Sequence, residues 1–109
     1  MLKALWASIQ CGRHHGKGNK FKDDGDLQKA IVHFLAALPY AEKTGNKGTV
    51  AFEMECIAIT YQLLRQPSDA MKYAEKSLNL YRTLAAQFDK DFFAEAALRV
   101  EQLMSEIQT

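Results

Sequence analysis

The sequence predicts an all-α fold, and three observations carry that prediction. Apolar residues recur at steps of three and four along most of the 109-residue chain. Only two prolines occur, and no segment shows the strict alternation of β-branched residues that marks a strand. A hydrophobic content of 48% with 25% charged residues is ordinary for a globular protein, and the length suits one core. Residues 1–109 are therefore expected to form a single domain of about five helices.

The first helix is expected between Leu2 and Asp24. Its early apolar residues form one helical stripe, made of Leu2, Leu5, Trp6 and Ile9. Gly12, Gly16 and Gly18 then each cost about 1 kcal/mol relative to alanine within a helix. The sequence leaves two alternatives open: a single helix anchored by tertiary contacts, or two helices with a break near Gly12.

The second helix is expected from Leu27 to about Lys43, after a turn at residues 24–26. Gly25 can take the left-handed conformation that ends a helix. Asp26 suits the N-cap, because its carboxylate can accept a hydrogen bond from an unpaired backbone N–H. Pro39 lies inside this helix, and its ring clashes with a carbonyl one turn back, so a kink is expected near residues 35–39.

Three further helices complete the predicted chain. Gly45 is the expected C-cap of the second helix, and a third helix follows over about residues 47–65. A turn containing Pro67 precedes a fourth helix over residues 69–84. After a connection at residues 87–89, the last helix covers about residues 89–107.

The last helix is expected to cap the fold with a polar outer face. The polar residues that would form this face are Glu95, Arg99, Glu101, Gln102 and Glu106. Phe92 and Phe93 are adjacent and cannot both point inward, so one of them is a candidate for an exposed contact.

The chain also contains an internal repeat with a period of 40 residues. Positions occupied by small residues stay small at this shift, and an aromatic position stays aromatic. Phe34 becomes Ala74, which departs from the pattern. The residues that carry the repeat are Gly18, Phe21, Gly25, Ala30, Phe34 and Ala37, followed by Ala58, Tyr61, Ala70, Ser77 and Leu78.

This pattern resembles the tetratricopeptide repeat (TPR) family in its longer-repeat form, over roughly residues 12–82. The resemblance implies one helical hairpin at about 12–43, a second at 46–84, and a C-terminal capping helix. It also implies a short right-handed superhelix whose concave groove binds a peptide or helix of a partner protein. The implied function is that of a scaffold or adaptor. The groove-facing residues would be His15, Asn19, Lys22, Phe52, Glu55, Ile59 and Gln62.

Two other interpretations of these groove residues stay open: they are solvated, or they are covered by the last helix. TPR domains that clamp a C-terminal carboxylate use a Lys and an Asn four residues apart, and here only Asn19 matches. His15 stands in the place of the Lys, and Cys56 stands in the place of the second Asn. The later basic positions fall on Phe92 and Ala96, so a carboxylate clamp is not expected.

The charge distribution is uneven, although the net charge is only +1. Residues 1–22 carry five basic residues and no acid. A nearly neutral chain argues against a nucleic-acid binder. Contact with phosphate or RNA through Lys17, Lys20 and Lys22 stays an alternative to the adaptor function. Homodimerisation through Trp6, Phe92 or Phe93 is a second alternative.

No pattern for catalysis, for a metal or for a cofactor emerges from the sequence. The segment 12–18 lacks the glycine spacing and the preceding strand of a phosphate-binding loop. Cys11, His14 and His15 lie close together, but no second ligand pair at regular spacing accompanies them. The two cysteines make no disulfide framework and favour a cytoplasmic location. The first ten residues are too short an apolar stretch for a signal peptide or a membrane span.

Overall fold

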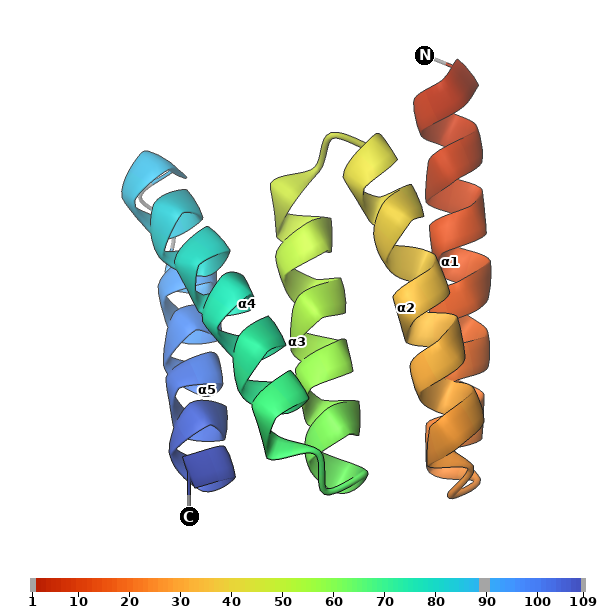
Figure 1. Cartoon of the computed structure of the whole chain (residues 1–109). Coiled ribbons are helices and arrows are strands. Elements are labelled where there is room, and N and C mark those ends of the chain that lie inside the picture. Colours follow the sequence, from red (N-terminus) through yellow and green to blue (C-terminus); the bar gives the residue numbers. More distant parts are fainter. Residues whose placement is uncertain (1, 89–90, 109) are drawn as a thin grey trace.

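The computed structural model describes residues 2–88 and 91–108, and within these ranges every regular element is an α-helix. The helices are α1 (Leu2–Asp23), α2 (Leu27–Lys43), α3 (Lys47–Leu63), α4 (Pro67–Phe88) and α5 (Asp91–Gln108). Successive helices run antiparallel and pack as neighbours, with α1 at one end of the row and α5 at the other (Figure 1). The all-α prediction is confirmed.

Helix α1 is one continuous helix, which decides between the two alternatives that the sequence left open. Its buried residues, Ala7, Cys11 and Gly18, follow each other at steps of four and seven. A Cβ built on Gly18 would lie 2.8 Å from ring atoms of the fully buried Phe34 on α2. The glycine therefore allows a close contact between α1 and α2, and this packing compensates for its low helix propensity.

The turn between α1 and α2 has the predicted chemistry. Gly25 has φ +84°, the left-handed conformation. The carboxylate of Asp26 accepts a hydrogen bond from the backbone N–H of Lys29 at 3.2 Å, which confirms Asp26 as the N-cap. Helix α2 has the predicted bounds and continues past Pro39. The C-cap of α2 is Thr44 rather than the predicted Gly45, which follows it with φ +74° and takes the left-handed conformation just past the helix end.

At the turn between α3 and α4, two helix ends differ from the predicted ones. Arg65 adopts φ 60°, so α3 ends at Leu63 rather than near Arg65. Helix α4 begins at Pro67, two residues before the predicted Asp69, because a proline at the first helical position forfeits no hydrogen bond.

The prediction for the end of α4 was wrong. Helix α4 continues to Phe88 rather than ending near Leu84, so Gln87 and Phe88 are helical instead of forming a connection. Leu84 is buried, and it extends the buried apolar face of α4 by another turn. Residues 89 and 90, at the predicted start of the last helix, lie outside the described ranges.

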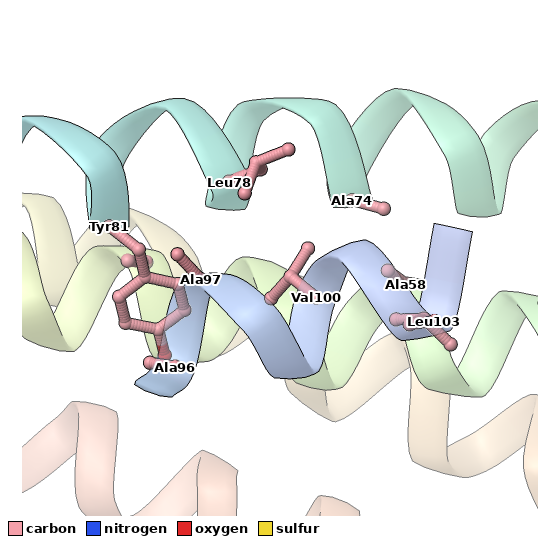
Figure 2. Packing of buried hydrophobic residues seen from close by; sticks show 9 residues of the cluster. Ala58, Ala74, Leu78, Tyr81, Ala96, Ala97, Val100 and Leu103 are labelled. Carbon is pink, nitrogen blue, oxygen red and sulfur yellow. The ribbon is translucent and has the colours of Figure 1, made fainter. Parts of the chain in front are cut away.

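Small residues lie where the helices touch, as the repeat predicts. Ala30, Ala58, Ala70 and Ser77 are all fully buried. Figure 2 shows the cluster shared by α3, α4 and α5, in which Ala58 and Ala74 lie beside larger side chains such as Val100. The Ser77 hydroxyl donates to the carbonyl of Ala51 at 2.8 Å, which satisfies a buried polar group.

A second cluster joins α2 to α3 and contains Ala30, Ile31, Phe34 and Ile57. Helix α3 therefore lies between two apolar clusters, and it has buried side chains around most of its circumference. Among the described residues, no helix combines the length and apolar character needed to cross a membrane.

Candidate functional site

Two buried glutamates on α3 point toward different neighbouring helices. Glu53 and Glu55 are only 2% and 3% exposed. Residues two apart on a helix project about 200° apart, so their carboxylates leave α3 on nearly opposite sides. Glu53 approaches α1, whereas Glu55 approaches α4 and α5. Burying a carboxylate is unfavourable unless its oxygens find partners, so those partners decide what each residue does.

The carboxylate of Glu55 is fully partnered. Its Oε1 accepts from the Tyr81 hydroxyl at 2.9 Å and from Arg99 Nη2 at 2.8 Å, and its Oε2 accepts from Arg99 Nε at 2.5 Å. Burial, reinforced by the charge of Glu55, raises the pKa of Tyr81, and hydrogen bonding to Glu55 raises the pKa of Arg99. Glu55 therefore ties α3 to α4 and α5 and has no oxygen left over for a ligand.

The carboxylate of Glu53 is only half partnered. Its Oε1 accepts from the Cys11 thiol at 3.8 Å and lies 2.8 Å from His15 Nδ1. Its Oε2 is buried and has no hydrogen-bond partner among the described residues. Such an oxygen is costly to leave unsatisfied, which makes Glu53 the most notable polar group of the molecule.

A second residue fixes the orientation of His15. The amide nitrogen of Asn19 lies 3.0 Å from His15 Nε2. Because an amide NH₂ can only donate, Nε2 acts as the acceptor and the ring proton is on Nδ1. Nδ1 lies 2.8 Å from Glu53 Oε1 but makes no hydrogen bond among the described residues. The ring of His15 also packs between Phe34 and Phe52, with centroid distances of 5.5 and 5.4 Å.

These residues line a cleft between α1 and the start of α3, with a volume of about 290 Å³. The residues around it are Ser8, Cys11, Gly12, His15, Thr44, Asn46, Thr49, Phe52 and Glu53. Phe52 is 44% exposed and leaves an aromatic surface beside the polar cleft. Gly12 leaves the side of α1 open there, since a Cβ at this position meets nothing within 4 Å.

The thiol in this cleft is not activated. Burial, reinforced by the charge of Glu53, raises the pKa of Cys11 to about 11. Burial likewise raises the pKa of Cys56 to about 12. Both thiols therefore stay protonated near neutral pH.

The structure separates the predicted groove residues into two groups. His15 and Phe52 line the α1–α3 cleft with Glu53, and Asn19 contacts His15 without lining the cleft itself. Glu55, Ile59 and Gln62 instead line a cleft of about 360 Å³ shared with α5.

Glu55 and Lys22 do not line the α1–α3 cleft. Glu55 is covered by α4 and α5, in line with the alternative that the last helix hides part of this set. Lys22 is half-buried near the end of α1 and does not line the α1–α3 cleft. Sequence reasoning left Glu53 out of the groove, although an acid within an apolar helix is a visible signal.

A ladder of aromatic rings on α1 and α2 was also missed. In order along the hairpin, the stacked or edge-on rings belong to Trp6, Tyr40, His14, His33 and Phe21. The Nδ1 atoms of His14 and His33 lie 3.2 Å apart, so one ring donates and the other accepts. Burial, reinforced by the charges of His14 and Lys17, lowers the pKa of His33.

Across residues 2–88 and 91–108, no group of three His, Cys, Asp or Glu side chains is arranged to hold a metal ion. No protein-family model matches this sequence, and comparisons with curated proteins and with solved structures find no match either. The geometry of the clefts therefore carries the functional argument.

Proposed function

We propose that this protein is a TPR-like adaptor that binds a peptide or helix of a partner protein at the α1–α3 cleft. The main support for the proposal is that one cleft combines the exposed ring of Phe52 with the buried Oε2 of Glu53, which has no hydrogen-bond partner among the described residues. An exposed aromatic ring next to a desolvated polar pocket is the arrangement found at the energetic centre of many interfaces. The TPR resemblance adds support, because it assigns the partner to the face that α1 and α3 share.

Binding here would satisfy two unfavourable features of the free protein at once. A side chain packed on Phe52 would remove apolar surface from water. A hydrogen-bond donor of the partner, brought into the cleft, would pair with Glu53 once the ring of His15 shifts to admit it. The free thiols Cys11 and Cys56 suit a reducing compartment, and we place this activity in the cytoplasm.

A matched pair of glycine substitutions tests the proposal. Gly12 and Gly16 are both exposed on α1, and neither has an atom within 4 Å of an added Cβ. Only Gly12 lines the cleft. Gly12→Leu should fill the mouth of the cleft, whereas Gly16→Leu adds the same side chain outside it. Both changes replace glycine within a helix, so both should preserve or raise stability.

The measurement is affinity capture from cell lysate with the full chain, followed by quantitative mass spectrometry. We expect one set of proteins to be captured by the wild type and by Gly16→Leu but lost with Gly12→Leu and with Phe52→Glu. Equal capture by all four proteins would exclude the cleft as the binding surface. Circular dichroism and thermal unfolding of each variant confirm that a loss of capture does not reflect unfolding.

A further inference from the structure

The outer surface of α1 combines exposed apolar side chains with basic ones. Leu2, Leu5 and Ile9 follow at steps of three and four and are between 52% and 82% exposed. Arg13 and Lys20 continue the same surface along the helix and are also exposed. We call these five residues the α1 face. Helix α1 carries five basic residues and a single acid, Asp23, and the α1 face holds two of the basic residues and no acid.

The outer surface of α5 has the opposite charge. Asp91, Glu95, Leu98 and Gln102 lie on one side of the helix and are all exposed. We call these four residues the α5 face. Leu98 is 63% exposed at its centre, and Phe92, at its edge, is 67% exposed. Helix α5 contains four acids and one base, Arg99, and that base is paired with Glu55 of the same chain.

Helices α1 and α5, which carry the two faces, lie at opposite ends of the row of helices (Figure 1). Among the described residues, no ion pair involves Arg13, Lys20, Asp91 or Glu95, so these charges are available for contacts between molecules. We propose that the α1 face of one molecule docks on the α5 face of a second copy, head to tail. This inference goes beyond the adaptor function and uses none of the residues that line the α1–α3 cleft.

Charge selects this arrangement over the symmetric ones. Pairing two α1 faces would bring Arg13 and Lys20 toward the same basic residues of the partner copy, and pairing two α5 faces would oppose acids. The head-to-tail contact instead opposes basic and acidic residues while covering Leu5, Ile9 and Leu98. After two molecules bind head to tail, one α1 face and one α5 face stay free at the ends of the pair. Further copies can therefore add, and longer chains form unless the rotation between successive molecules closes a ring.

Surface variants at each end provide the test. Leu5→Gln with Ile9→Gln disables the α1 face by removing its apolar contacts, and Glu95→Lys with Leu98→Lys disables the α5 face by reversing its charge. All four side chains are exposed, so the folded monomer should survive, as circular dichroism can confirm. The molar mass of the full chain is measured by sedimentation velocity over a wide dilution series, at low and at high salt.

Wild type should form concentration-dependent oligomers that weaken as salt rises, because screening reduces the attraction between exposed charges. Each double variant alone should be monomeric. An equimolar mixture of the two variants should form a 1:1 dimer and nothing larger, because only one intact α1 face and one intact α5 face remain to meet.

Three results would overturn the inference. A wild-type protein that stays monomeric throughout the dilution series would exclude self-association. Oligomers that persist when only one of the two faces is disabled would indicate a symmetric contact through the other face. A mixture of the two variants that stays monomeric would show that the two faces do not bind each other.

Discussion

Gly18 shows how a single missing side chain determines the packing of the first hairpin. The ring of Phe34 occupies the space that a Cβ would need, and Phe34 is fully buried and cannot withdraw. We expect Gly18→Ala to lower the free energy of unfolding by about 1 to 3 kcal/mol, despite the better helix propensity of alanine.

Gly16→Ala is the matched control, because its Cβ would meet open space. That change should leave stability unchanged or raise it by up to about 1 kcal/mol. Urea unfolding followed by circular dichroism measures both variants. Equal stability of the two alanine variants would mean that α1 and α2 are not in close contact at Gly18.

The burial of His33, reinforced by its contact with His14, makes stability depend on pH. The pKa of His33 is lowered in the folded protein, so the unfolded chain binds a proton more readily. The free energy of unfolding should therefore decrease as pH falls from about 7.5 to about 5.5, through the ordinary histidine range. Lys17 is the other charged group that lowers the pKa of His33, and it is positive throughout this range.

Urea unfolding at several pH values tests this prediction. His33→Gln removes the titrating group and should flatten the dependence between those two limits, and His14→Gln should do so in part. A slope that is the same in wild type and in His33→Gln would locate the pH dependence elsewhere in the chain.

At the scale of elements, two arginine–glutamate pairs attach α5, and they should contribute unequally. Arg99 holds the buried Glu55, whereas Arg82 pairs with the exposed Glu101 at 2.7 Å. Arg99→Met should cost about 1 to 3 kcal/mol, because it removes two of the three hydrogen bonds of a buried carboxylate. Arg99 is itself 53% exposed, so water can reach the vacated position and limits the loss.

Arg82→Met provides the comparison and should cost less than about 1 kcal/mol, as is typical of an exposed pair. Thermal unfolding of both variants measures the difference. If the two changes cost the same, the contacts of Glu55 would not be what holds α5 in place.

Helix boundaries were predictable from the sequence where local chemistry sets them. Gly25, Asp26 and Gly45 act within one turn of themselves, and the bounds of α2 follow from these residues. The continuity of α1 was not decidable, because it depends on the distant side chain of Phe34 filling the space beside Gly18. The extension of α4 to Phe88 likewise depends on the burial of Leu84.

The candidate site shows the same division between local and distant determinants. The TPR resemblance predicted one surface for His15, Asn19 and Phe52. In the structure His15 and Phe52 line the cleft, and Asn19 contacts His15. The different environments of Glu53 and Glu55 were not predictable from the sequence, because each environment depends on which basic residue the carboxylate contacts. Arg99 lies 44 residues away from Glu55 in the sequence, and no local pattern pairs them.

For the whole molecule, the order of contacts has a consequence for how it opens. Most contacts between helices join consecutive helices, and α3 contributes side chains to two of the buried clusters. A row of elements with mainly nearest-neighbour contacts can lose an end without losing its middle, because α1 and α5 each pack mainly on one helix. Backbone amides of α3 should therefore exchange with deuterium only through global unfolding, whereas those of α1 exchange through a partial opening of lower free energy.

Native-state hydrogen exchange in a series of low urea concentrations would separate these two routes. If α1 and α3 exchanged with one common free energy and one common urea dependence, the five helices would unfold as a single unit. If the amides of α1 exchanged at a lower free energy than those of α3, a small population of molecules would have α1 detached from α3. The cleft between these two helices would be open in that population. Access to Glu53 would then be governed by the same equilibrium that determines how long the first helix remains docked.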